Sequence, residues 1–222
     1  MIAGVLLAGG ASTRMGRPKP LVKDGAESFL ARGVRRLWTA CDSVVVVLGS
    51  EAREVRTRAE QEFERLLSSG KLHDDLRQAH GHGKAELEVR FAVNPRWKQG
   101  MYSSVRCGLE GALELRPAAA MLMPVDHPAV HAMTVASLAG VMLQALAACR
   151  PGRERKAFSY ALIPRFQAQR GHPIALSPAL AQAVVQDRAA DSLSEAIRRN
   201  ARMVGYLDVH DRGVVVNRNH PR

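Results

Sequence analysis

Glycines, hydroxyl groups and cationic side chains are concentrated between Leu6 and Lys19, in the sequence LLAGGASTRMGRPK. Gly9 and Gly10 permit a tight turn and the close approach of a ligand, since neither carries a Cβ atom. The polar groups that follow are the hydroxyls of Ser12 and Thr13 and the cations of Arg14, Arg17 and Lys19. Donors and cations around one turn are the groups that hold a polyphosphate. The segment is therefore predicted to bind a nucleotide.

This turn differs from two common glycine motifs. Gly10 and Gly16 have the spacing of a Walker A loop, but Arg17 and Pro18 follow in place of its lysine and hydroxyl residue. A dinucleotide-binding GxGxxG fingerprint does not begin at Gly9 either. A turn that carries ordinary surface cations is the alternative interpretation.

A second candidate group is the carboxylate of Asp126, in the sequence Pro-Val-Asp-His-Pro that follows the apolar run Ala119–Met123. In doubly wound sheets, ligands bind beyond the carboxyl ends of the strands. A carboxylate there can hold Mg²⁺, which takes one or two protein oxygens in addition to substrate phosphates. Asp126 is therefore predicted to bind a metal ion, and a helix N-cap is the alternative.

A turn that enters a helix, Gly-Met-Tyr-Ser-Ser over residues 100–104, offers further hydroxyl groups. Helix N-termini attract anions and present free N–H groups. Ser103 and Ser104 either contact the nucleotide or the acceptor, or they only cap the helix.

A basic turn, Arg-Gly-His-Pro, begins at residue 170. Binding residues are often placed on such loops. We expect Arg170, Gly171 and His172 to close over an acceptor molecule, with a structural surface histidine as the alternative for His172. In the polar segment Ser68–Lys84, a solvated loop is favoured over a metal site.

Strand and helix patterns alternate along most of the chain. Strands are predicted at Ile2–Leu7, Ser43–Leu48, Leu87–Val93 and Ala119–Met123. Helices are predicted over Ser28–Ala40, Glu51–Leu67, Ser103–Leu115 and His131–Cys149. The second of these helices is expected to turn Val55, Phe63, Leu66 and Leu67 inward. Such alternation predicts an α/β fold with a mostly parallel sheet and helices on both faces.

The later part of the chain has shorter apolar pieces. Its predicted strands are Phe158–Ile163, Pro173–Leu176, Met203–Val209 and Val214–Val216. Its predicted helices are Pro178–Gln186 and a helix that runs to Asn200 behind the capping box of Ser192 and Glu195. Without an internal repeat or a linker, residues 1–222 are predicted to form a single domain, with residues 68–84 as a loop insertion.

Composition narrows the classes of function. A net charge of +11 favours anionic partners, but the basic residues are scattered and only 5% of the residues are aromatic, which disfavours nucleic acid. The odd number of cysteines, Cys41, Cys107 and Cys149, argues against a disulfide framework. Prolines and charged residues interrupt the longest apolar tract, Ala118–Cys149, and the N-terminus lacks a basic leader region. We therefore expect a cytoplasmic protein without a membrane partner.

The two main motifs together resemble those of a known family. LLAGGASTRMGRPK is similar to the LAGGxSxRMGxxK signature of the MobA-like nucleotidyltransferases, and PVDHP resembles the PxDxP metal-binding element of that family. The segments Asn94–Leu109 and Arg170–Leu180 resemble the molybdenum-cofactor cytidylyltransferase branch. The resemblance covers most of the chain, apart from residues 68–84.

The resemblance implies a Rossmann-like three-layer α/β/α fold and a definite reaction. An acceptor phosphate attacks the α-phosphorus of a nucleoside triphosphate, and pyrophosphate leaves. Mg²⁺ is the implied cofactor, with Mn²⁺ as an alternative. The implied substrates are CTP and a phosphorylated pterin, molybdopterin, with GTP or a sugar phosphate as alternatives within the class.

The resemblance also implies a role for particular residues. The implied nucleotide-binding residues are Leu7, Ala8, Gly9, Gly10, Ser12, Arg14, Lys19, Ser103 and Ser104. Arg14 and Lys19 would neutralise the β- and γ-phosphates, and the metal on Asp126 would bridge the phosphates. The family has a second ligand in a DxDTP or NxNTP element, where this chain has Asn-Arg-Asn-His-Pro. Asn219 matches that ligand, and a polar C-terminal turn is the alternative.

Two other classes of protein compete with this interpretation. The uncharged Asn219 makes a catalytically weak binding or chaperone protein of the same fold conceivable. The net positive charge suggests a nucleic-acid binder, against which the low aromatic content argues.

Overall fold

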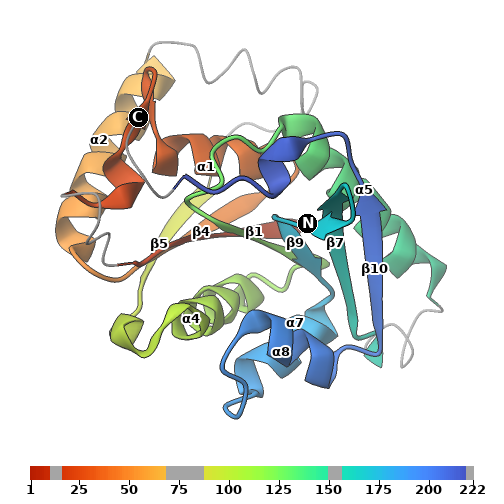
Figure 1. Ribbon diagram of the computed structural model, residues 1–222. Coiled ribbons are helices and arrows are strands. Elements are labelled where there is room, and N and C mark those ends of the chain that lie inside the picture. Colours follow the sequence, from red (N-terminus) through yellow and green to blue (C-terminus); the bar gives the residue numbers. More distant parts are fainter. Residues whose placement is uncertain (11–16, 69–87, 150–156, 219–222) are drawn as a thin grey trace.

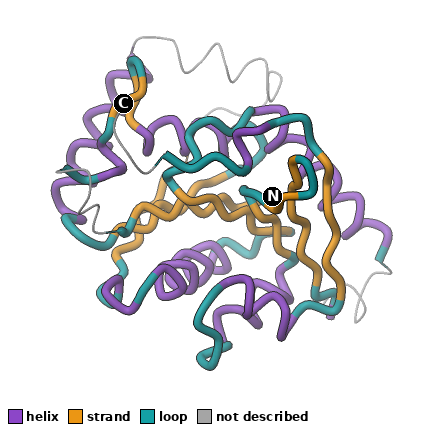
Figure 2. The backbone as a smooth tube through the Cα atoms, in the orientation of Figure 1, coloured by secondary structure: helices purple, strands orange, loops and turns teal. Residues whose placement is uncertain are grey.

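The computed structural model describes residues 1–10, 17–68, 88–149 and 157–218 (Figure 1). A twisted sheet runs through the centre of the described part and lies between two layers of helices (Figure 2). Its strands are β1 (Ile2–Ala8), β4 (Ser43–Leu48), β5 (Glu88–Val93), β6 (Ala119–Pro124), β7 (Tyr160–Phe166), β8 (Gln169–Arg170), β9 (Ile174–Leu176) and β10 (Met203–Asp208).

The strands follow the order β10-β7-β9-β6-β1-β4-β5, and β8 pairs with β7. β1 lies between β4 and β6 and is parallel to both, and β5 is parallel to β4. β9 is antiparallel to β6 and to β7, whereas β10 is parallel to β7. The predicted α/β fold with a largely parallel sheet is confirmed.

Two apolar clusters cover the two faces of the sheet. Helices α1 (Phe29–Trp38), α2 (Ala52–Ser68) and α5 (Ala132–Ala148) pack on one face, and α4 (Met101–Glu114), α7 (Pro178–Gln186) and α8 (Leu193–Asn200) pack on the other. Along β1, Val5 belongs to one cluster and Leu6 to the other, because successive side chains of a strand point to opposite faces. This double burial explains the continuous apolar runs of the central strands.

Several boundaries agree closely with the sequence patterns. β4 and α7 have the predicted bounds. The hydroxyl of Ser28 accepts a hydrogen bond from the N–H of Ala31 at 3.1 Å, so it caps α1 as predicted. Helix α4 begins at Met101, two residues before the predicted start, directly after Gly100, whose φ is +101°.

The predicted strand at Val214–Val216 is wrong. The chain forms a 3₁₀ turn, η4 (Arg212–Val214), because the buried carboxylate of Asp211 accepts a hydrogen bond from the N–H of Gly213 at 2.8 Å. The carbonyl of Val214 accepts a hydrogen bond from the N–H of His172 at 2.8 Å. Apolar character here therefore reflects packing against the turn at residue 172.

The inward position of Leu67 is also wrong, since its side chain is exposed. Glu62 is buried on α2 instead, because its carboxylate accepts a hydrogen bond from the N–H of Ser28 at 2.9 Å and lies 3.7 Å from Lys23 Nζ. Residues 69–84 of the predicted insertion lie outside the described part of the chain. Within the described part, the helices are too short or too polar to cross a lipid bilayer.

Candidate functional site

The glycine turn and Asp126 meet at one cavity, which we call the glycine-turn cavity. It has a volume of about 390 Å³ and lies beyond the carboxyl ends of β1 and β6. Predicted site residues that line it are Leu7, Ala8, Gly9, Gly10, Lys19, Ser104 and Asp126. Lys19 begins the 3₁₀ turn η1 (Lys19–Leu21), and its Nζ lies 3.4 Å from Oδ2 of Asp126. The structure thus brings a cation and a carboxylate from distant segments to the glycine turn.

Glycine at position 49 allows the backbones that follow β1 and β4 to touch. A Cβ atom at Gly49 would overlap the carbonyl oxygen of Gly9, and it would lie 2.7 Å from the Cβ of Trp97. Only glycine fits this approach without displacement of the turn. The sequence analysis did not identify Gly49, because a single glycine after a strand gives no sign of which backbone it approaches.

The carboxyl group of Asp126 is held in its ionised form. Burial by itself raises the pKa of Asp126, but the hydrogen bond and charge of His127, followed by the charge of Lys19, lower it below its ordinary value. The Nδ1 atom of His127 lies 3.0 Å from Oδ1 of Asp126. Asp126 is also no helix N-cap, since α5 begins at Ala132.

The residues present fit a divalent metal that is shared with a substrate. Among the described residues, no group of three or more His, Cys, Asp or Glu side chains is arranged to hold a metal ion alone. Asp126 supplies one anionic oxygen donor at the glycine-turn cavity, and Mg²⁺ characteristically uses one or two carboxylates together with substrate phosphates.

A larger cavity adjoins the first, and we call it the apolar cavity. Its volume is about 830 Å³. Its walls include Arg170, Gly171 and His172 with the apolar side chains of Tyr102, Leu122, Ile163, Ile174 and Val204. Leu7, Met101 and Pro124 line both cavities. The predicted acceptor turn and the predicted nucleotide turn are therefore neighbours across a shared wall.

His172 is neutral near pH 7. Burial, together with the charge of His127, lowers the pKa of His172 from 6.5 to about 4, and the charge of Asp126 opposes this only in part. The rings of His127 and His172 meet edge to face with their centroids 4.9 Å apart. The Nδ1 atom of His172 is buried and has no hydrogen-bond partner among the described residues. This is not the environment of a surface histidine.

Arg170 is held at the edge of the apolar cavity by an aromatic ring. Its guanidinium carbon lies 5.3 Å from the centroid of Tyr206, and that of Arg165 lies 4.7 Å from the same ring. Arg165 is in turn fixed by two contacts of 2.9 and 2.8 Å with the carboxylate of Asp208. Tyr206 also lines the apolar cavity. Sequence analysis missed it, because an aromatic residue on a strand carries no signal of this stacking.

The structure separates the roles of Ser103 and Ser104. The hydroxyl of Ser103 lies 2.8 Å from the carbonyl of Gly100, so Ser103 takes part in the turn before α4 and does not line the glycine-turn cavity. Ser104 does line that cavity. Asn94, which sequence analysis missed, donates to both hydroxyls from its Nδ2, at 2.8 and 3.0 Å.

Three predicted site residues, Ser12, Arg14 and Asn219, lie outside the described part of the chain. The nearest described neighbour of Asn219 is Arg218, whose backbone N–H donates to the carbonyl of Asp126 at 2.8 Å. The chain before residue 219 therefore passes directly beside the Asp126 turn.

Comparisons with known proteins agree with this fold. The chain is 30% identical to nicotine blue oxidoreductase from Paenarthrobacter nicotinovorans over 220 residues, which cover 95% of this chain and 88% of that protein. A nucleotidyl transferase from Methanothermobacter thermautotrophicus has a similar fold, with a TM-score of 0.65, 18% identity and coverage of 99% and 92% of the two chains.

A Mycobacterium tuberculosis protein that was solved as a complex with manganese is also similar in fold. Its TM-score is 0.54, with 18% identity and coverage of 94% of this chain and 88% of that one. The MobA-like NTP transferase domain matches residues 4–204, which include the glycine turn, Asp126 and the turn at residues 170–172. The chain therefore belongs to the family of MobA-like NTP transferases.

Proposed function

We propose that this protein transfers a nucleoside monophosphate from a nucleoside triphosphate to a phosphorylated acceptor, with CTP and molybdopterin as the favoured substrates. The observation that carries the proposal is the pair of cavities with a shared wall. The glycine-turn cavity has donors and charges suited to a triphosphate, and the apolar cavity is suited to a ring system.

In the proposed reaction, an oxygen of the acceptor phosphate attacks the α-phosphorus, and the bond from that phosphorus to the bridging oxygen of pyrophosphate breaks. Backbone groups from Leu7 to Gly10, with Ser12 and Ser104, hold the nucleotide. Arg14 and Lys19 offset the charge that develops on the leaving pyrophosphate. Asp126 and Asn219 would hold Mg²⁺ or Mn²⁺, which neutralises phosphate oxygens when bound.

The apolar cavity supplies orientation and excludes water. Its apolar walls would bury the ring of the acceptor, and Arg170 and His172 would bind its polar groups. Gly171 leaves room for the carbonyl of Val214, which packs against this turn. Positioning is the main requirement of such a transfer, because the attacking phosphate oxygen is already anionic. The preference for CTP rests on the resemblance of Asn94–Leu109 and Arg170–Leu180 to the cytidylyltransferase branch. GTP and a sugar phosphate are the competing substrates.

An assay of pyrophosphate release in the presence of Mg²⁺ tests the proposal. Each of the four ribonucleoside triphosphates is combined with molybdopterin and with sugar phosphates. We expect the fastest release with CTP and molybdopterin. An Asp126→Asn variant, which keeps the side-chain shape, is the matched control for metal-dependent turnover. Absence of pyrophosphate from every combination would contradict the proposed function.

A second candidate function is an oxidoreductase that acts on a planar heteroaromatic compound. The relative named nicotine blue oxidoreductase and the size of the apolar cavity favour it. The electrons would have to come from a second substrate, and a reduced nucleotide would suit the glycine-turn cavity. Oxidation of NADH or NADPH that depends on a heteroaromatic dye, without pyrophosphate release, would identify this activity and replace the first proposal.

A further inference from the structure

The last described residues connect the Asp126 turn to a hairpin near the start of the chain. The backbone N–H of Arg218 donates to the carbonyl of Asp126 at 2.8 Å. Its guanidinium Nη1 lies 3.0 Å from Oδ2 of Asp24. Arg218 therefore holds the backbone of the proposed metal ligand with its main chain and a second carboxylate with its side chain.

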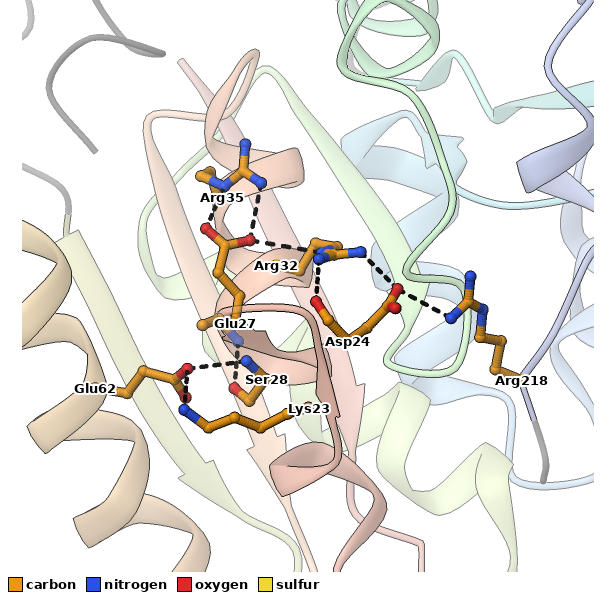
Figure 3. A network of polar contacts seen from close by, with 9 residues as sticks. Lys23, Asp24, Glu27, Ser28, Arg32, Arg35, Glu62 and Arg218 are labelled. Carbon is orange, nitrogen blue, oxygen red and sulfur yellow. Dashed lines mark hydrogen bonds and ion pairs between the residues drawn. The ribbon is translucent and has the colours of Figure 1, made fainter. Parts of the chain in front are cut away.

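Asp24 is itself fixed to helix α1. It lies in a two-stranded hairpin formed by β2 (Lys23–Asp24) and β3 (Glu27–Ser28). Arg32 of α1 contacts both the carboxylate of Asp24, at 2.6 Å, and its backbone carbonyl. Figure 3 shows Asp24 between the guanidinium groups of Arg32 and Arg218. The hairpin is thus anchored to α1, and the side chain of Arg218 binds to the anchored carboxylate of Asp24.

We propose that Arg218 is a positioning residue for Asp126 and that Asp24 acts through it, which rests on the proposed metal-binding role of Asp126. The backbone of Asp126 lies in a turn after β6, and its carboxylate contacts Lys19 at 3.4 Å and the adjacent His127 at 3.0 Å. The hydrogen bond from the N–H of Arg218 adds a restraint on the backbone of this turn. Residues that orient a metal ligand affect metal affinity, and their mutation typically costs about 10- to 100-fold.

The ion pair is suited to this task by its surroundings. Both partners are partly shielded, with side-chain exposures of 24% for Arg218 and 29% for Asp24, so water screens their attraction less than that of surface pairs. Neither residue lines the glycine-turn cavity. A change at either position therefore alters the restraint on Asp126 without removal of a group that contacts the nucleotide.

Manganese binding tests the proposal without turnover. The free Mn²⁺ signal in electron paramagnetic resonance, compared at one CTP concentration with and without protein, gives the apparent metal dissociation constant of the protein–CTP complex. For Arg218→Ala we expect a constant about five-fold higher than that of the wild type, below the usual range because Arg218 contacts the backbone of Asp126 rather than its carboxylate. Arg218→Lys, which keeps a cation beside Asp24, should recover part of the loss.

The double-mutant cycle makes the test specific. Asp24→Asn, which also weakens the contact with Arg32, should weaken Mn²⁺ binding at least as much as Arg218→Ala does. The double variant should be no worse than Asp24→Asn, because both changes remove the contact between Asp24 and Arg218. Lys23→Ala is the matched control. It removes the neighbouring ion pair of the same hairpin, with Glu62, and should leave the dissociation constant unchanged. Melting temperatures establish that each variant is folded.

The outcomes separate this inference from the proposed function. Wild-type affinity for Mn²⁺ in Arg218→Ala, additive effects in the cycle, or no Mn²⁺ binding by the wild type would each overturn the positioning role. A different result would separate the two proposals. The wild type would release no pyrophosphate but would bind Mn²⁺, and this binding would be abolished by Asp126→Asn and weakened by Arg218→Ala. The positioning role would then stand, and the proposed function would fail.

Discussion

The glycine-turn cavity and the apolar cavity share a wall, but they are assembled from the sequence in different ways. The first gathers short contiguous motifs at the carboxyl ends of parallel strands, around Gly9 and Asp126. The second lies where β9 reverses direction, and its walls come from residues as far apart as Leu7 and Tyr206. The charged groups of the first cavity thus lie in a few short motifs, although Lys19 and Asp126 are far apart along the chain, whereas the apolar walls of the second cavity come from many segments.

This contrast predicts a division of labour. Charged and backbone groups of the glycine-turn cavity should govern the rate of the transfer step, because they act on charge that develops in the transition state. Apolar groups should govern acceptor affinity, because burial of a ring contributes equally before and during the reaction. Variants in the two cavities should therefore change different kinetic constants.

The largest effect is expected for Asp126→Asn. Loss of the anionic ligand should lower kcat for pyrophosphate release by about 10³-fold, at the upper end for removal of one electrostatic group. The KM for the acceptor should change little. Glu60→Gln, which removes an exposed ion pair on α2, is the control. An equal loss in acceptor affinity would break the proposed division between the cavities.

Acid should destabilise the region around His172. Its pKa is lowered from 6.5 to about 4, so between these values the unfolded chain binds more protons than the folded chain. Stability is therefore complete above about pH 6.5 and falls as the pH drops toward 4, by about 3 kcal/mol in total. Urea unfolding at several pH values should show this loss in the wild type and not in His172→Gln. Parallel curves for the two proteins would refute the lowered pKa of His172.

Lys19→Met tests the cationic side of the glycine-turn cavity. Removal of the charge should lower kcat/KM for the nucleoside triphosphate by about 10²-fold, because one contact with the leaving pyrophosphate is lost. Steady-state kinetics with varied triphosphate provides the measurement. Lys23→Met, on the neighbouring hairpin, should behave as the wild type. A change confined to acceptor KM would assign Lys19 to the other cavity.

The smallest effects are expected on the acceptor side. Arg170→Gln should raise the acceptor KM by about ten-fold, because one charge-assisted hydrogen bond is lost. The triphosphate KM should change little. Tyr206→Leu should raise the acceptor KM by about three-fold, because it removes the ring that positions Arg170. Initial rates with varied acceptor distinguish the two. A greater loss for Tyr206→Leu than for Arg170→Gln would show that the ring binds the acceptor directly.

The sequence predicted local features of the structure better than contacts between distant segments. The bounds of Ser43–Leu48, the cap at Ser28 and the family follow from local patterns, and all of these were confirmed. The proximity of Lys19 to Asp126 also agrees with the rule that ligands bind beyond strand ends.

The elements that sequence patterns missed depend on contacts between distant segments. Val214 was predicted to lie in a strand, because local propensity does not show that Asp211 closes a turn there. The residues around Gly49 do not show that it contacts the backbone of Gly9. Those around Tyr206 do not show that its ring stacks on guanidinium groups. Buried Glu62 was unpredictable for the same reason, since its hydrogen-bond partner is 34 residues away.

Leu7, Met101 and Pro124 line both cavities at once, which has a consequence for inhibition. One molecule that joins a nucleotide to a fused ring would fill the two spaces together and lose its freedom of motion only once. We therefore expect the joined product to dissociate slowly and to inhibit more strongly than either fragment. Calorimetric titration of the product and of the separate fragments would measure this gain, and equal affinities would mean that the two sites are not filled together.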